Sequence, residues 1–342
     1  MKIETILSDL MKIMSVSGFE NEMCEQIERM MCSFCDTVEI NRFNSVICHK
    51  KSKNPHAEKI MIEAHLDQIG LMVKEFDEKG HIKFISVGGI DKRILPGSEV
   101  LISGKENVYG VIGSKPPHLK EKADKDKMPD IDELLIDTGY TKVALEEKIS
   151  IGDSIVLKSV FNRLVGDNYC GKALDNRAGM AAVIAAATEI SDSPYEIYYV
   201  FTSEEELGLH GAYSAAKEIK PDYAIVVDVT HGKTIDTENE AGVFELGCGA
   251  VICRGPSLNC EVSQKLVDIS ERAKIKYDIE VASGHSGTNA WVIQKAWGSC
   301  KTGLVSIPLK YMHTSVEMIN ISDIKEVSRL LSEVLKGGLD NA

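Results

Sequence analysis

Two histidines and three carboxylates stand where strands are expected to end or helices to begin. His65 follows the apolar run KIMIEA, Asp228 ends YAIVVD and His313 follows GLVSIPLKYM. Glu206 comes after EIYYVFTS, and Asp175 opens an alanine-rich helical pattern. Imidazole nitrogens and carboxylate oxygens are the ligands that borderline and hard divalent metal ions take. The set is sufficient for two ions about 3.5 to 4 Å apart, bridged by one carboxylate, with one histidine and one acid on each ion.

Each of these residues also has an ordinary structural explanation. Asp175 suits the N-cap of the helix that follows it, and Glu206 completes an S-x-x-E capping box. His65 and His313 could be core histidines with satisfied hydrogen bonds, and Asp228 could be a turn residue. Taken singly, these explanations are at least as good as metal binding. The five together favour a metal site, because such a combination of ligands is much more specific than any of its members.

An H-x-D spacing adds a second feature. Asp67 lies two residues after His65, so its carboxylate can contact the ring nitrogen that does not bind metal. Such a contact fixes the imidazole tautomer and raises the basicity of the ligand nitrogen. Asp67 is therefore predicted to tune His65 and not to bind metal itself.

Three regions of the chain differ in their apolar patterns. Residues 1–70 and 166–342 alternate strand-like and helical segments, which predicts an α/β domain with a mostly parallel sheet and helices on both faces. Residues 71–165 contain short apolar runs broken by turns, which predicts an inserted small all-β domain. Within the insert, residues 115–130 combine prolines with dense charge, as expected of a solvated loop. In open α/β sheets ligands bind beyond the carboxyl ends of the strands, so the acids and histidines should share one crevice.

Composition argues against several classes of protein. The 342-residue chain carries a net charge of −13 at pH 7, whereas a nucleic-acid-binding protein needs a basic surface. Its longest apolar run, residues 178–187, is far shorter than the roughly 20 residues of a membrane span. The N-terminal segment mixes acids into its apolar positions, unlike a secretory signal, so a cytoplasmic protein with nine reduced cysteines is expected. Neither nucleic acid nor a membrane is expected as a partner.

Seven sequence blocks occur in the same order as in a known family and together span nearly the whole chain. The blocks are SGFE at 17–20, EAHLDQIGLMV at 63–73, GVIGSKPPH at 110–118, GKALDNRAG at 171–179, EELGLHGA at 205–212, VVDVTHG at 226–232 and SIPLKYMHTSVE at 306–317. With these blocks the sequence resembles the tetrahedral (TET) aminopeptidases, which include glutamyl, leucyl and deblocking aminopeptidases and are often called endoglucanase M. The resemblance implies an aminopeptidase that acts on peptides.

The resemblance distributes the five candidate ligands over two divalent metal ions per subunit. It makes His65 and Asp228 ligands of one ion, and Glu206 and His313 ligands of the other. Asp175 bridges the two ions. Zinc and cobalt are the metals that the resemblance suggests, although the ligand set alone is compatible with manganese as well.

Catalytic and substrate-binding roles also follow from the resemblance. Glu205 becomes the general base that takes a proton from the attacking water, and Asp67 supports the site. Gly287, Thr288 and Asn289 are expected to bind the substrate. Asn289 stands where the family usually has an aspartate, so neutral or acidic first residues are expected to be cleaved better than lysine.

An additional glutamate precedes the catalytic pair. In the run Glu204, Glu205 and Glu206, composition alone cannot say which residue does what. Only the register against the block ELGLHGA assigns the base and the ligand. Glu204 is then expected to be a spectator at the strand end.

The insert at 71–165 matches, in the family, a barrel-like dimerisation domain. Family members assemble from such dimers into a hollow tetrahedral dodecamer. The resemblance therefore implies a homo-dodecamer built from dimers, with self-association through the insert. The insert contains none of the five candidate ligands.

Two other functions are compatible with parts of the pattern. Paired carboxylates also serve glycoside hydrolases, as the endoglucanase label implies. Histidine ligands have no role in that chemistry, Glu205 and Glu206 are adjacent in sequence, and the chain has only two tryptophans for stacking sugars. A non-catalytic metal-binding scaffold would tolerate loss of a ligand or of the base, and none is missing. A metal-dependent aminopeptidase is therefore the preferred prediction.

Overall fold

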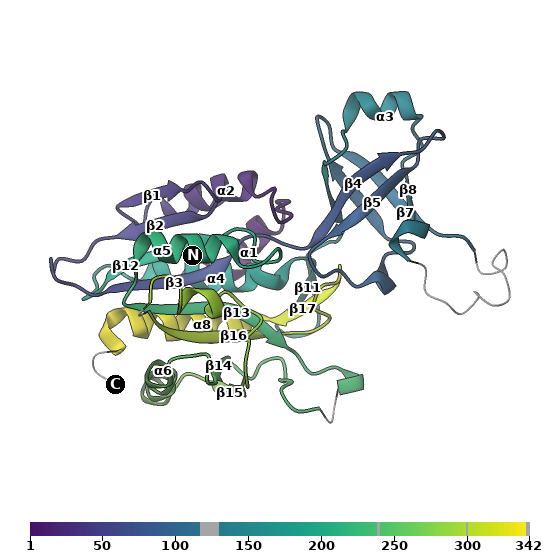
Figure 1. Cartoon of the computed structure of the whole chain (residues 1–342). Helices are drawn as coiled ribbons and strands as arrows, with labels where there is room; N and C mark the ends of the chain where they lie inside the picture. The colour runs from purple at the N-terminus through teal and green to yellow at the C-terminus, as the bar shows by residue number, and fades with distance from the viewer. Residues whose placement is uncertain (117–129, 238–239, 299, 340–342) are drawn as a thin grey trace.

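A computed structural model describes residues 1–116, 130–237, 240–298 and 300–339 of the chain (Figure 1). Its centre is an eight-stranded sheet in the order β1-β2-β12-β3-β13-β16-β14-β15. The strands are Thr37–Ile40 (β1), Val46–Lys50 (β2), Lys59–His65 (β3), Glu196–Thr202 (β12), Tyr223–His231 (β13), Ala250–Arg254 (β14), Tyr277–Val281 (β15) and Lys301–Leu309 (β16).

The sheet is mixed. Strands β12, β3, β13 and β16 run parallel to their neighbours within this central group, as do β14 and β15 with each other. The hairpin of β1 and β2 adds antiparallel strands at one edge, and β14 pairs antiparallel to β16. The α/β class is thus confirmed. The predicted parallel pairing holds for the central strands and for β14 with β15, but not for β1, for β2 or for the pairing of β14 with β16.

Alternate residues of the central strands pack against different helices. In β3, Ile60 and Ile62 are in one apolar core, whereas Met61 is in a second core. The first core includes residues of α1 (Ile3–Leu10), α2 (Asn21–Met31), α4 (Leu174–Glu189), α6 (Cys260–Ala273) and α8 (Ile321–Glu333). The second core includes residues of α5 (His210–Ile219) and α7 (Ala290–Ile293). Because successive side chains of the central strands are buried in one core or the other, these strands are nearly continuous apolar runs.

A closed six-stranded barrel extends away from the large sheet in Figure 1. Its interior is apolar, with Ile102, Ile136 and Ile155 fully buried. The all-β character predicted for this part of the chain is confirmed, while the division into domains at 1–70, 71–165 and 166–342 remains a prediction. The barrel strands are Gly70–Phe76 (β4), Ile82–Val87 (β5), Glu99–Ser103 (β6), Val108–Gly113 (β7), Leu135–Asp137 (β8) and Ser154–Leu157 (β9), and α3 (Lys142–Lys148) precedes the last of them.

A three-stranded sheet lies between the barrel and the start of α4. It consists of Asn162–Arg163 (β10), Asn168–Gly171 (β11) and Glu317–Asn320 (β17), in the order β10-β11-β17. Gly171 pairs with Glu317, so β17 is held beside the turn that leads into α4. This arrangement brings together two chain segments that are distant in sequence.

Three smaller expectations have different outcomes. Most of the loop predicted at 115–130 lies outside the described residues, since 117–129 are not among them. All nine cysteines are free thiols in the structure. Among the described helices, none combines the length and the apolar character needed to cross a membrane.

Candidate active site

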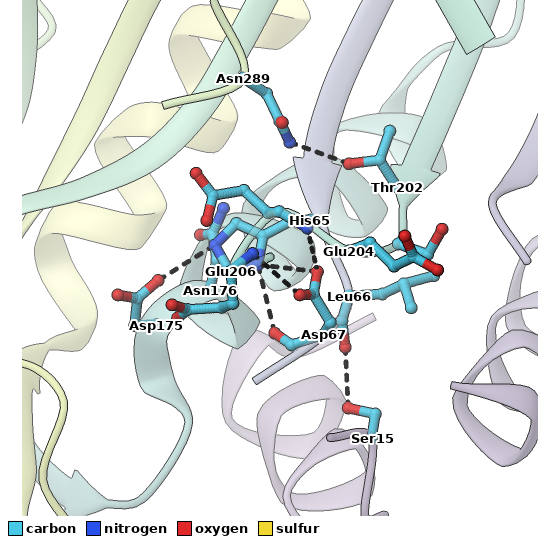
Figure 2. A network of polar contacts seen from close by, with 12 residues as sticks. Ser15, His65, Leu66, Asp67, Asp175, Asn176, Thr202, Glu204, Glu206 and Asn289 are labelled. Carbon is cyan, nitrogen blue, oxygen red and sulfur yellow. Dashed lines mark hydrogen bonds and ion pairs between the residues drawn. The ribbon is translucent and has the colours of Figure 1, made fainter. Parts of the chain in front are cut away.

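The predicted site residues meet at one edge of the sheet. His65 is the last residue of β3, Asp228 lies in β13, and Glu206 follows the end of β12. These three strands are parallel neighbours, so their carboxyl ends meet at the same edge. All five candidate ligands and Glu205 line one cavity of about 660 Å³. Figure 2 shows the side chains of His65 and Asp175 in contact at this point.

Two groups of metal-ligand atoms share a single residue. His65, Asp175 and Asp228 can each offer one ligand atom, all within 4.8 Å of one another. Asp175, Glu206 and His313 form a second such group. The two groups use different oxygens of Asp175. Its Oδ1 lies 3.1 Å from His65 Nε2, whereas its Oδ2 lies 3.4 Å from His313 Nε2.

Hydrogen bonds orient both imidazoles toward this shared carboxylate. His313 Nδ1 lies 2.7 Å from the carbonyl oxygen of Gly89, in the segment that follows β5 of the barrel. His65 Nδ1 lies 3.2 Å from the carbonyl oxygen of Asp67. A carbonyl oxygen can only accept a hydrogen bond, so each Nδ1 carries a proton. A metal ion would then bind at Nε2, in place of the proton that this nitrogen otherwise shares with the carboxylates.

The ligand candidates perturb one another's protonation. Burial raises the pKa of Asp228 and of Glu206. Burial also disfavours the charged form of Asp175, but hydrogen bonds with His313 and His65 lower its pKa overall. Hydrogen bonds with Asp175 and Glu206 raise the pKa of His313 to about 11. A divalent cation would compete with protons for these donors, because metal ligands must be deprotonated. The donor set, two imidazole nitrogens and three carboxylates, therefore fits divalent metal ions.

Asp67 has two structural roles, of which the sequence indicated one. Its Oδ1 lies 3.4 Å from His65 Nδ1, as the H-x-D spacing suggested. Its two carboxylate oxygens also accept the backbone N–H groups of Glu205 and Glu206, each at 3.1 Å. Asp67 is 2 % exposed, so these hydrogen bonds are shielded from water. It thus fixes the turn that carries the predicted base and a predicted ligand.

The side chains of the consecutive residues Glu204, Glu205 and Glu206 have different neighbours. Glu205 lines the cavity, and burial raises its pKa to about 9. Glu206 Oε1 lies 3.4 Å from His313 Nε2. Glu204 is not among the lining residues, and its Oε2 lies 2.8 Å from Nδ1 of the exposed His210. This arrangement agrees with the register that assigns Glu205 and Glu206, and not Glu204, to the site.

Comparison with known proteins assigns a family to this arrangement. The model of the M42 glutamyl aminopeptidase family matches residues 44–330. The chain belongs to this family. The match confirms the resemblance inferred from the sequence blocks and supports aminopeptidase activity.

Individual M42 relatives span the whole chain. The lysyl aminopeptidase of Pyrococcus furiosus is 30 % identical, with 97 % of this chain and 96 % of the relative covered. The crystal structure of a TET aminopeptidase from a marine-sediment Thaumarchaeota archaeon has a TM-score of 0.93 at 26 % identity, covering 99 % of this chain and 98 % of that one. The Pyrococcus horikoshii TET1 peptidase, which can assemble into a tetrahedron or a large octahedral shell, has a TM-score of 0.86 at 29 % identity, with 98 % and 99 % covered.

One residue expected at the substrate lies elsewhere in this M42 family member. Gly287 and Thr288 line the cavity, but Asn289 is not among the lining residues and is 1 % exposed. Its Nδ2 donates to Glu63 Oε1 at 2.8 Å and to Thr202 Oγ1 at 2.9 Å, the second of which Figure 2 shows. The expectation that Asn289 changes the charge near the first residue of the substrate therefore loses its structural basis.

Sequence analysis missed one buried acid of the M42 site. Glu317, which is 1 % exposed, accepts the backbone N–H of Asp175 at 3.2 Å and the backbone N–H of His313 at 2.9 Å. Burial raises its pKa to about 8. Glu317 therefore positions the shared carboxylate and one histidine together. Its only signal in the sequence is an acid four residues after His313, inside a block that already matched the family.

Proposed function

We propose that this chain is a metal-dependent aminopeptidase that hydrolyses the N-terminal residue of peptides and holds two divalent metal ions. The observation that supports this most strongly is Asp175, whose two oxygens belong to two different groups of ligand atoms. His65 and Asp228 would complete one metal site, and Glu206 and His313 the other. When bound, two such ions polarise the peptide carbonyl and lower the pKa of water toward neutrality. Zinc or cobalt are the metals expected.

Glu205 is the proposed general base. It lines the same cavity as the ligand candidates, and the positive charge of bound ions would keep its carboxylate ionised and able to accept a proton. It would take the proton of the attacking water and pass it to the leaving amine, which typically contributes roughly 10²- to 10⁴-fold to the rate. Asp67 would position Glu205 through its backbone N–H and would keep His65 in the tautomer that leaves Nε2 free. Glu317 would hold the backbone of Asp175 and His313.

The cavity suits a peptide end better than a polysaccharide. A volume of about 660 Å³ is within the usual range of small-ligand pockets, about 300–1,000 Å³. Its ligand groups contain histidine, which has no role in glycoside hydrolysis by paired carboxylates. A scaffold without catalysis would not need a general base beside the ligands. The names of the relatives and of the family refer to different first residues, lysine and glutamate, so they leave the preferred residue of this chain open.

Release of p-nitroaniline from aminoacyl-p-nitroanilides tests the proposal. We expect turnover with a free N-terminus, no turnover when the same amino group is acetylated, and loss of turnover after chelation with EDTA. Carboxymethyl cellulose should remain intact with or without metal. Cleavage of the cellulose, or aminopeptidase activity that survives complete removal of metal, would contradict the proposal.

We also propose that the insert at 71–165 mediates self-association and that the chain forms a homo-dodecamer built from dimers. The barrel presents apolar side chains to solvent, including Tyr109, Val111, Val143 and Ile151, the last two being 69 % and 65 % exposed. Exposed apolar side chains on a domain without ligand residues are candidates for an interface between subunits. The assembly of the P. horikoshii relative into a closed shell supports the same idea. A cytoplasmic location remains a prediction from the sequence.

Light scattering of the purified chain measures its assembly directly. We expect a particle many times heavier than the 37.6 kDa chain. Lysine at both Val143 and Ile151 should shift the mass toward smaller species if these residues lie in an interface. A monodisperse 37.6 kDa species that is fully active would contradict self-association as a requirement.

A further inference from the structure

The cavity has a second wall that the proposed hydrolysis does not use. Five carboxylates line the cavity among the described residues, and four of them are the candidate ligands and the base. The fifth is Glu280, in β15. Neither lysine nor arginine occurs among the described lining residues. The wall around Glu280 is therefore acidic and has no permanent positive charge.

A hydroxyl group holds the Glu280 carboxylate in place. Glu280 Oε1 accepts a hydrogen bond from Thr230 Oγ1 of β13 at 2.9 Å, although β16 and β14 separate β13 from β15 in the sheet order. Among the described residues no lysine, arginine or histidine nitrogen forms an ion pair with it. Glu280 is half-buried and lines the cavity, and among the described residues Thr230 is its only hydrogen-bond donor.

The partly buried position of Glu280 makes a positive partner favourable. Burial raises its pKa, whereas the hydrogen bond from Thr230 and the charge of the nearby His231 act in the opposite direction. A carboxylate without a cation in partly dehydrated surroundings is disfavoured, and a positive charge from a ligand would stabilise its ionised form. Glu280 would therefore be stabilised by a positive charge on the substrate.

Apolar side chains lie in the same cavity. Cys253 is directly opposite Glu280 in the pairing of β14 and β15. Val292 and Leu304 also line the cavity, and Leu304 is 2 % exposed. An apolar surface with one acid beside it is complementary to an aliphatic stem that ends in a positive charge.

We propose that Glu280 selects peptides whose first residue has a cationic side chain, lysine or arginine. This inference rests on the proposed aminopeptidase function. The methylene groups of the first residue would lie against the apolar wall, and its ammonium or guanidinium group would donate to the free oxygen of Glu280. This proposal replaces the expected preference for neutral or acidic first residues, which was based on Asn289.

Lysyl- and norleucyl-p-nitroanilide are a matched pair of substrates for the test, because norleucine keeps the aliphatic chain and lacks the ammonium group. We expect the wild-type enzyme to have a kcat/KM at least tenfold higher for lysine than for norleucine. Glu280→Gln retains an oxygen for Thr230 and should lower kcat/KM for lysine roughly ten- to a hundredfold, as for loss of one charged hydrogen bond. The value for norleucine should stay within about threefold.

Two further variants separate charge at the cavity from other effects. Asp278→Asn removes an acid of the same strand that is exposed and does not line the cavity, so it should leave the lysine-to-norleucine ratio unchanged. Glu280→Lys should invert the preference and favour glutamyl-p-nitroanilide. A gain of activity on glutamate cannot result from misfolding.

The possible outcomes distinguish the two proposals. If wild-type enzyme cleaves norleucyl-p-nitroanilide but shows no preference for lysine, the selectivity inference alone is overturned. Equal losses on both substrates in Glu280→Gln would also overturn it and would place the α-ammonium group of the substrate at Glu280. Absence of cleavage of every aminoacyl substrate by metal-replete wild type would overturn the aminopeptidase proposal, and this inference with it.

Discussion

Glutamine in place of Glu205 is expected to lower kcat by roughly 10²- to 10⁴-fold while the metal content of the enzyme stays the same. An amide can still hydrogen-bond to the attacking water, but it cannot accept its proton. Glu205 belongs to neither group of candidate ligand atoms, so metal binding should not depend on its charge. Steady-state kinetics and elemental analysis of the same preparation give both values.

Glu204→Gln is the matched control for this experiment. The Glu204 side chain contacts exposed His210 and is not among the cavity-lining residues, so the variant should keep kcat within about threefold and lose at most about 1 kcal/mol of stability. An inactive, metal-replete Glu204→Gln enzyme beside an active Glu205→Gln enzyme would show that the catalytic pair is assigned one residue too late.

Asparagine in place of Asp175 should have an even larger effect, because it changes both metal sites at once. The Asp175 carboxylate is the only ligand candidate that occurs in both described groups. A neutral amide is a much poorer ligand for a divalent ion than a carboxylate, and its nitrogen cannot take the place of the second oxygen. We expect metal affinity to fall more than about 100-fold. This loss exceeds the roughly 10- to 100-fold loss that is typical when a residue hydrogen-bonded to a metal ligand is replaced. Activity should disappear with the metal.

Glu206→Gln provides the comparison for Asp175→Asn. Glu206 belongs only to the group with Asp175 and His313, so its replacement should weaken one ion and leave the other bound. Elemental analysis of the two variants should therefore differ by about one ion per chain. Loss of the same number of ions from both variants would contradict the role of Asp175 as a bridge. Circular dichroism of each variant controls for misfolding.

The clustering of the candidate ligands could be predicted because their chemistry and their positions are both local properties of the sequence. His65 and Asp228 lie at the ends of apolar runs that became parallel neighbouring strands. Parallel strands end at the same edge, so a pattern along the chain became a cluster in space. The α/β class and the all-β insert were predictable for a similar reason, since periodicity and turn residues are local.

Contacts between distant segments could not be predicted in this way. The carbonyl oxygen that orients His313 belongs to the backbone of Gly89, and every residue type has such an oxygen. The residue type at position 89 therefore gives no sign of this contact. Glu317 reaches Asp175 only because β17 pairs with β11. The mixed character of the large sheet likewise depends on which strands become neighbours, and on the antiparallel hairpin at its edge.

Asn289 and Glu280 show the same limit for substrate selection. Family resemblance placed Asn289 near the substrate, yet its amide is turned toward Glu63 and Thr202. Glu280 lies in a short strand whose neighbours are mostly exposed, so it resembled a surface acid until β15 was placed beside β14. The direction of a side chain at a site depends on tertiary packing and not on spacing.

Reconstitution of the chelated enzyme with measured amounts of Zn²⁺ or Co²⁺ tests the central claim most directly. Activity on an aminoacyl-p-nitroanilide should be absent in the metal-free protein and should reach its plateau at two equivalents of metal per chain. Asp175→Asn should remain inactive over the same range. Full activity without bound metal would contradict a metal-dependent aminopeptidase, and a plateau at one equivalent, with no second ion bound, would contradict the two-ion site.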